Sequence, residues 1–305
     1  MSVNASEFIK SNDAAYYPAT LSPDMSGILT YDAEGAVAKI NGEDVKLLDA
    51  AFELSLVQPG SVQSKKELAS KVGKLWMKVE TDPINNEDFY DELYLMPISV
   101  VGYRRSKFTK FDNSTKAASP LCFSLDGLVP SPSMSVTPDC EQCATLERVN
   151  GTFRMDAVCP SAIWQNGEKP ACQLTMSVAF MTLGKCIPVI MNLHGVGMSA
   201  FNKLRRDSKK VKNVARLRNK SIDNYVIRLT TDNAGTYVAP VFSFVEAPEE
   251  FGDVSVYKKL AVYFRNSMFT HSSEAAAEET PAVEAVKEEQ VKEDVTASED
   301  ATFDI

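Results

Sequence analysis

Four cysteines lie close together in the middle of the 305-residue chain. Cys140 and Cys143 form a Cys-x-x-Cys pair, and Cys159 and Cys172 follow with twelve residues between them. Two thiolates on one tight turn, with a second pair closing a tetrahedron, form the arrangement that Zn²⁺ prefers. Four protein thiolates leave no coordination position for water, so such a site is structural rather than catalytic. The spacing predicts a zinc-binding, zinc-ribbon-like subdomain over residues 120–175.

Other interpretations of these cysteines stay open. A reducing compartment disfavours disulfides, a redox Cys-x-x-Cys pair lacks its usual βαβ context, and the thiols could be buried without any link. A metal would also stabilise a loop that has few core residues. The other two cysteines, Cys122 and Cys186, have apolar neighbours and are expected to be ordinary buried thiols.

The densest positive run covers residues 203–220, where nine cations accompany a single acid, Asp207. Like charges four residues apart destabilise a helix unless something neutralises them, and a phosphate backbone does so. An ordinary solvated helix face is the alternative, and a nuclear-localisation signal is formally possible. The run predicts nucleic-acid contacts from Lys203, Arg205, Arg206, Lys209, Lys210, Lys212, Arg216, Arg218 and Lys220.

A second group interleaves rings and cations over residues 103–111. In a strand, Arg105 and Lys107 would share one face, while Arg104 and Phe108 would share the other. Exposed rings among cations suit single strands, because bases stack on the rings while the phosphates follow the charge. The alternative is that the rings at the two ends belong to the core. The predicted binding residues are Tyr103, Arg104, Arg105, Lys107, Phe108, Lys110 and Phe111, with Tyr225, Arg228 and Tyr237 as weaker candidates.

Enzyme chemistry has little support in the sequence. With only two histidines, His194 and His271, histidine-based acid–base chemistry is disfavoured, and no phosphate-binding glycine loop follows a strand. A metal-dependent nuclease would need clustered carboxylates such as Asp126, Asp139 and Asp156. Their spacing does not single them out, and an Asp before a Gly is more often a turn residue. We therefore expect a protein that is not an enzyme.

Strands must position most of these residues. Asn41-Gly42 favours a type I′ turn, because both of its central residues need positive φ. Apolar residues alternate with polar ones on both sides of two further turns, which is typical of hairpins. The expected strands and hairpins lie at 36–40 with 43–48, 93–101, 173–193 and 225–244.

Helical periodicity is expected over 64–79, 199–219 and 254–269. Many short strands with helices between them predict a mainly β α+β body, over residues 1–271, built on a barrel-like core. Residues 272–305 are too polar to bury a core and are expected to be a disordered tail.

Charge is unevenly distributed along the chain. The whole sequence carries −9, but residues 272–305 alone contain eleven acids and two lysines, so the remainder is neutral. Residues 1–100 have 16 acids against 8 cations, whereas residues 101–235 have 19 cations against 10 acids. This asymmetry suggests a polyanion-binding face and an acidic arm that competes for it or recruits partners.

Together these features resemble the bacteriophage single-stranded DNA-binding, or helix-destabilising, proteins. The likeness is architectural over most of the chain. Across residues 120–245 it includes motifs similar to cysteine patterns of phage replication-associated proteins: Cys122-Phe-Ser-Leu-Asp126-Gly127, Cys140-Glu-Gln-Cys143, Cys159-Pro160 and Pro170-Ala-Cys172. The resemblance implies an OB-fold core that binds single strands without sequence preference. It also implies a tail that recruits polymerase, primase or recombination proteins.

The leading expectation is therefore a single-stranded DNA-binding protein of replication, recombination and repair, with a structural zinc ion. The alternative is a zinc-stabilised scaffold protein whose basic helix meets an acidic protein partner. No apolar run approaches the roughly 20 residues that span a bilayer, and the N-terminal residues lack the pattern of a signal peptide. We expect a cytoplasmic protein, in the host cytoplasm if a phage encodes it.

Overall fold

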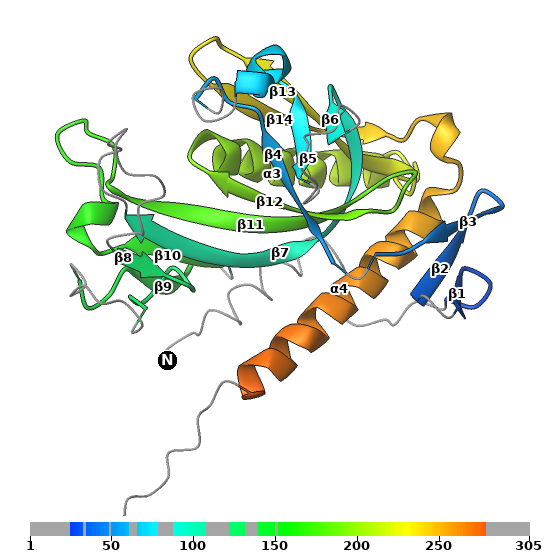
Figure 1. Cartoon of the computed structure of the whole chain (residues 1–305), viewed down its shortest axis with the longest axis horizontal. Helices are drawn as coiled ribbons and strands as arrows, with labels where there is room; N and C mark the ends of the chain where they lie inside the picture. The colour runs from blue at the N-terminus through cyan, green and yellow to red at the C-terminus, as the bar shows by residue number, and fades with distance from the viewer. Residues whose placement is uncertain are drawn as a thin grey trace, which may run out of the picture. The chain divides into compact units, whose positions relative to one another are not determined.

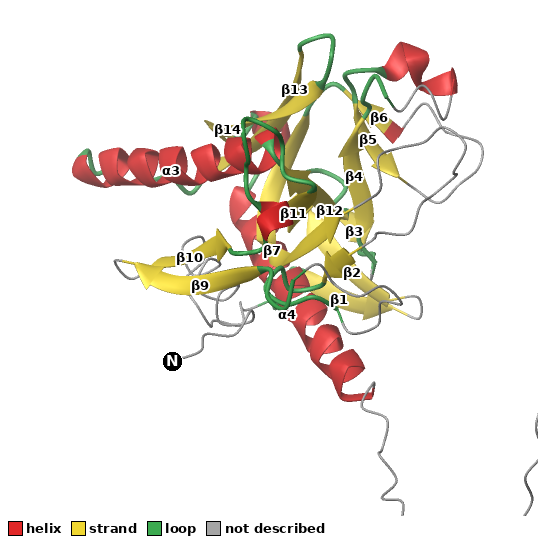
Figure 2. Cartoon of the chain, turned by 90° about the vertical axis from the view of Figure 1, so that its left-hand side faces the viewer, coloured by secondary structure: helices red, strands yellow, loops and turns green. Residues whose placement is uncertain are grey.

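One large curled sheet forms the centre of the protein. The computed structural model describes residues 25–32, 35–48, 50–60, 66–78, 88–107, 122–131, 140–149 and 152–278. The fold is mixed α+β and mainly β, and Figures 1 and 2 show the sheet curling into a half-barrel. In the described part of the chain, no helix is long and apolar enough to cross a membrane.

The large sheet has nine strands, of which eight follow one another in a single order and the ninth, β8, adds to the side of β7. The two long central strands, β7 and β11, are antiparallel, and the β12–β4 pair is parallel. The order is β14 (Val238–Glu246), β13 (Tyr225–Asn233), β7 (Leu93–Lys107), β11 (Cys172–Thr182), β12 (Pro188–His194), β4 (Phe52–Leu56), β5 (Leu75–Lys78) and β6 (Phe89–Tyr90), with β8 at Cys122–Ser124.

Both hairpins predicted in the second half of the chain are confirmed. The segment 173–193 forms β11 and β12, in which Thr175 pairs with His194 and Met181 with Pro188. The segment 225–244 forms β13 and β14. The alternating pattern gave the correct partners because a short turn brings adjacent strands together before any distant segment is needed.

Two smaller hairpins complete the strands. The predicted turn at Asn41-Gly42 is confirmed, with φ of 51° and 88°, and it joins β2 (Gly35–Ile40) to β3 (Glu43–Lys46) beside β1 (Leu29–Asp32). β9 (Ala144–Val149) and β10 (Thr152–Ala157) form a separate two-stranded sheet. In Figure 1 this sheet lies at the far end of β7 and β11, next to β8.

Helix α3 (Val196–Leu217) confirms the helix predicted over 199–219 and covers one face of the core. It packs against β12 and β14, and its buried residues are Gly197, Phe201, Leu204 and Ser208. The Phe201 ring meets the Phe180 and Phe242 rings at centroid distances of 5.8 and 5.5 Å. Because the buried positions recur every three to four residues, the remaining faces of the helix are left to solvent.

The prediction of a helix over 64–79 is wrong. A 3₁₀ turn covers Lys66–Lys71 (η1), and residues 75–78 form strand β5 instead. Gly73 lies between them with φ of 93°, a conformation that ends a right-handed helix. Leu75 and Met77 are buried whereas Trp76 and Lys78 are half-buried, which is the two-residue period of a strand.

The last helix is longer than expected. Helix α4 runs over Val254–Glu278, so residues 272–278, which we assigned to a disordered tail, are helical. Their Ser-Glu-Ala-Ala-Ala composition contains strong helix formers and no breaker. The chain divides into one compact unit that ends at Ser267 and a second that begins at Met268. Residues 279–305, the rest of the predicted tail, lie outside the described residues.

Candidate nucleic-acid interface and thiol cluster

The basic run lies on the solvent-facing side of α3. Of its nine cations, Lys203, Arg206, Lys209, Lys210 and Arg216 are exposed on the helix, and Arg218 and Lys220 are exposed just after it; Arg205 and Lys212 are half-buried. Asp207, the one acid in the run, pairs with Lys210 at 3.7 Å. The structure thus collects an excess of positive charge on one helix, which Figure 2 shows reaching beyond β14 at its C-terminal end.

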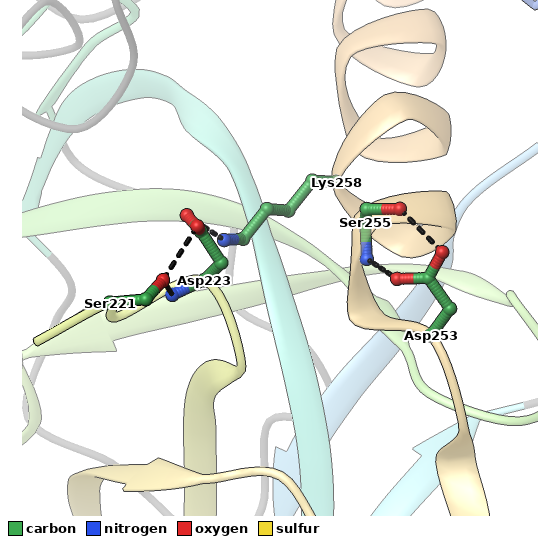
Figure 3. Close-up of polar contacts among 5 residues, drawn as sticks. All are labelled: Ser221, Asp223, Asp253, Ser255 and Lys258. Carbon is green, nitrogen blue, oxygen red and sulfur yellow. Dashed lines mark hydrogen bonds and ion pairs between the residues drawn. The ribbon is translucent and has the colours of Figure 1, made fainter.

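Lys212, near the end of α3, is affected by its surroundings. Burial first, and then the positive charge of Lys258 on α4, lower the pKa of Lys212. Lys258 itself pairs with Asp223 at 3.5 Å, and Asp223 also accepts a hydrogen bond from the Ser221 hydroxyl (Figure 3). An anion placed here would relieve this repulsion between cations.

The second predicted group does not form one binding surface. Tyr103 is buried, and Arg105 is only 4% exposed. The Arg105 Nε donates a hydrogen bond to the Gly127 carbonyl at 3.0 Å, and Lys107 Nζ donates to Ser161 Oγ at 3.2 Å. Tyr103 and Arg105 are therefore corrected from binding residues to interior ones, because they face the covered side of β7. Arg104, on the opposite face, is exposed; Phe108, Lys110 and Phe111 lie outside the described residues.

The weaker candidates on β13 and β14 are engaged with neighbours. The Tyr225 ring lies against the Phe244 ring with centroids 5.2 Å apart. Arg228 pairs with Glu92 at 2.6 Å, so its charge is locally neutralised. Tyr237, in the loop between the two strands, is exposed. Of the predicted binding residues that are described, those on and just after α3 form the largest exposed cationic group.

Strand register brings two cysteines to one end of the large sheet. Lys107 of β7 pairs with Cys122 of β8 on one side and with Cys172 of β11 on the other. Directly paired residues of antiparallel strands point to the same face. Cys122 and Cys172 therefore share a face with Lys107 and Arg105, and both thiols are buried.

The β9–β10 hairpin brings three more cysteines to this place. Cys143 precedes β9 and Cys159 follows β10, and the Val158 and Cys159 amides both donate to the Cys143 carbonyl, at 3.1 and 3.4 Å. Cys140 Sγ lies 3.8 Å from Cys143 Sγ, and Cys159 and Cys172 share one buried cluster against which Cys140 packs. We call Cys122, Cys140, Cys143, Cys159 and Cys172 the thiol cluster.

The environment of the thiol cluster favours neutral thiols in the absence of a cation. Burial raises the pKa of Cys172 to about 11. Burial, followed by interactions with Cys159 and Cys143, also raises the pKa of Cys140. The six cysteines are all free thiols. Among the described residues, no group of three or more His, Cys, Asp or Glu side chains is already arranged as a metal site.

Two of the three carboxylates considered for nuclease chemistry have structural partners. Asp126 accepts hydrogen bonds from Ser124 Oγ at 2.9 Å and from the Leu128 and Val129 amides at 2.8 and 3.1 Å. This is a turn-stabilising role, as the following glycine suggested. Asp156 pairs with Arg154 at 2.7 Å, and Asp139 lies outside the described residues. The structure therefore adds no support for the nuclease alternative.

Two features of this region were missed from the sequence. Cys122 was separated from the other cysteines, although its strand lies beside β7 and places it in the thiol cluster. Trp164 was not considered, although its side chain is 67% exposed. The Asn166-Gly167 turn that follows Trp164 was a visible signal, since such pairs fix a tight turn and present their neighbours to solvent. Comparison with protein-family models, curated proteins and solved structures finds no match to this chain.

Proposed function

We propose that this protein binds single-stranded DNA without sequence preference, in replication, recombination and repair. The observation that carries the proposal is the α3 face, on which a helix anchored by four buried residues presents exposed cations over several turns. Phosphates neutralise such a face, and the released counterions make binding strongly dependent on salt. A regularly spaced row of cations contacts the backbone and reads no bases, which accounts for binding without sequence preference.

The proposal depends on this face and does not depend on one fold type. The nine-stranded order with a parallel β12–β4 pair differs from the five-stranded barrel of an OB-fold. An OB-like core would have to be a part of the curled sheet. The exposed cations of α3 would contact phosphates in the same way on an OB-fold or on this sheet, because binding to the nucleic-acid backbone needs only cations at the surface.

The test is fluorescence anisotropy with labelled oligo(dT) and a matching duplex, at low and moderate salt. Replacing Lys203, Arg206 and Lys210 with Gln should weaken single-strand binding and flatten the salt dependence by about 0.7 in log–log slope per lost phosphate contact. The matched control replaces Lys39, Lys66 and Lys185, which are exposed cations outside α3, and should bind like the wild type.

Two results would contradict the proposal. The first is equal binding by the α3 variant and the wild type. The second is no binding of either oligonucleotide by the wild type, which would favour the scaffold alternative, in which the cations of α3 meet an acidic protein.

We also propose that the thiol cluster holds one structural zinc ion through Cys140, Cys143, Cys159 and Cys172. With Zn–S bonds of about 2.3 Å, the sulfurs of a tetrahedral site lie about 3.8 Å apart, and Cys140 and Cys143 have this separation. Four thiolates on Zn²⁺ leave a net negative charge, and the buried Arg105 guanidinium beside them would offset it. The zinc would join the β9–β10 hairpin to the end of β7 and β11.

Metal analysis of the purified full-length chain tests this proposal. We expect about one zinc per chain, lost in Cys143→Ser and Cys159→Ser and retained in Cys186→Ser, whose thiol is buried outside the cluster. Cobalt substitution should give a thiolate charge-transfer band. Protein that contains no zinc after expression in zinc-supplemented medium, and gives no cobalt band, would overturn the assignment.

A further inference from the structure

Trp164 is a large aromatic side chain held out in solvent by a well-defined turn. Gln165 and Glu168 form an antiparallel bridge around Asn166-Gly167, whose φ values of 52° and 80° are those of a type I′ turn. The Glu168 amide donates to the Gln165 carbonyl at 2.8 Å, and Gln165 Nε2 donates to the Pro160 carbonyl at 3.2 Å. The exposed indole therefore stands on an ordered segment.

The other tryptophan, Trp76, is packed against the protein instead of exposed. Trp76 is half-buried and stacks on Phe89 with ring centroids 5.6 Å apart. Trp164 leaves 67% of its side chain in water, at a cost set by its exposed apolar area. Ile163, which precedes it in the sequence, is exposed as well. An ordered and exposed indole of this kind is typical of a contact surface for another molecule.

Cations lie in the same region as this indole. Trp164 immediately precedes the Gln165–Glu168 bridge and Lys169 immediately follows it, so the two residues stand on the two sides of the turn. Arg104 and His194 both pair with Thr175, which places them on one face of β7, β11 and β12. Partial burial, followed by the charges of Lys169 and Arg104, lowers the pKa of His194. Lys169 and Arg104 therefore both lie near His194.

We propose that Trp164 stacks on an unpaired base of a bound single strand, while Lys169 and Arg104 contact the phosphates on either side of that base. A ring with its face in solvent and cations beside it matches the chemistry of a base and its backbone. This inference rests on the proposed function and adds a second contact to it, formed by residues outside α3. A duplex is excluded from this contact, because its bases are already stacked on one another.

Intrinsic fluorescence tests the stacking directly. In a Trp76→Phe background Trp164 is the sole tryptophan, and oligo(dT) should quench its emission at the same concentrations that raise the anisotropy of labelled oligo(dT). If the Trp76→Phe protein does not fold, the difference in emission quenching between the wild type and Trp164→Phe reports the quenching of Trp164. Duplex at equal nucleotide concentration should leave the emission unchanged.

Affinity provides the second readout. Trp164→Ala should weaken oligo(dT) binding roughly 5- to 150-fold, the range for loss of one stacked base, and Trp164→Phe should retain most of the affinity. The control is Tyr31→Ala, which removes a ring of similar exposure (70%) from the small β1–β3 sheet. It should bind like the wild type.

Failure of this inference can be distinguished from failure of the proposed function. Binding by anisotropy, with unchanged Trp164 emission and full affinity in Trp164→Ala, would overturn the inference and leave the α3 proposal intact. Binding that survives the α3 variant but not Trp164→Ala would support the inference alone. No binding of any oligonucleotide by the wild type would overturn both.

Discussion

At the level of single residues, neighbouring cations on β7 have opposite environments. Arg105 is buried, next to the thiol cluster, and donates to the Gly127 carbonyl, whereas Arg104 is exposed on the other face of the strand. The pleat alone makes this difference, since successive side chains of a strand point to opposite faces. The two arginines therefore serve as controls for each other.

Arg105→Ala should destabilise the fold by about 1.5–3 kcal/mol, because a buried hydrogen bond from a charged group is lost. Arg104→Ala should change the free energy of unfolding by no more than about 0.5 kcal/mol, as an exposed substitution does. Urea unfolding followed by circular dichroism measures both. A loss in Arg105→Ala as small as the one expected for Arg104→Ala would contradict a structural role for Arg105.

His194 gives a pH dependence whose sign is fixed by its surroundings. Its pKa in the folded protein is lowered, by partial burial and then by Lys169 and Arg104, so the unfolded chain binds the proton more readily. Its contribution to stability is therefore full above the unfolded pKa of about 6.5 and declines as the pH falls through that value toward the folded pKa.

Urea unfolding at pH 7, 6 and 5 should accordingly show a steeper loss of stability in the wild type than in His194→Gln. His271→Gln, at the chain's other histidine, provides the reference for removal of an imidazole. A slope that is unchanged in His194→Gln would contradict the assigned direction of the pKa shift.

At the level of elements, one face of α3 packs against the sheet and the other carries the exposed cations. Leu204 is 2% exposed against the sheet, whereas Leu217 at the end of the same helix is 84% exposed. Leu204→Ala should cost about 2–5 kcal/mol of stability through lost burial and the cavity left behind. Leu217→Ala should cost less than about 0.5 kcal/mol. Thermal and urea unfolding of the two variants test this, and similar losses would place the packed face of α3 elsewhere.

Helix α4 begins with a side-chain cap. Asp253 accepts from the Ser255 amide at 2.9 Å and from the Ser255 hydroxyl at 2.7 Å (Figure 3). These hydrogen bonds lower the pKa of Asp253, so the cap is lost as the pH falls through that lowered pKa.

Asp253→Ala should cost about 0.5–2 kcal/mol at pH 7, and Asp253→Asn less, because the amide oxygen still caps. The measurement is urea unfolding at pH 7 and at pH 3, where the difference between the wild type and Asp253→Ala should shrink. A constant difference at both pH values would contradict a role for the carboxylate.

Local signals in the sequence predicted local structure well. The turn at Asn41-Gly42, the two large hairpins and the helix over 199–219 followed from turn chemistry and periodicity. The strand β5 was missed because Leu68, Val72 and Leu75 imitate a helical period, and the backbone break between them depends on the single residue Gly73. The place of Cys122 was missed for another reason: it depends on which strand β8 joins, and no pattern within residues 122–124 encodes that partner.

At the level of the whole molecule, charge is separated along the chain. Residues 101–235 carry a net positive charge, and residues 279–305 hold nine acids against two lysines. On the proposed function, deleting 279–305 should tighten oligo(dT) binding at low salt, because an acidic segment on the same chain would compete with DNA for the cations of α3. The deletion leaves α4 whole, which a cut at residue 272 would not.

Anisotropy titrations of the wild type and the deletion, at several salt concentrations, test this competition. The difference should fade as salt screens both interactions. A full-length variant with the nine acids changed to Gln or Asn should behave like the deletion. Equal affinity with and without residues 279–305 would remove the competition from the proposal.

The strand order also determines when this protein can fold. Phe52 of β4 pairs with Val189 of β12, and the first residues of β7 pair with β13, so strands synthesised early have partners that are synthesised late. During translation, β4, β5 and β6 emerge with an unpaired edge, the form of strand that is most prone to aggregation. Pairings this distant in sequence also slow the search for the native state. Ribosome-bound chains that stop before β12 should therefore be protease-sensitive and bind chaperones, and protection should arise only once β12 and β13 have been synthesised.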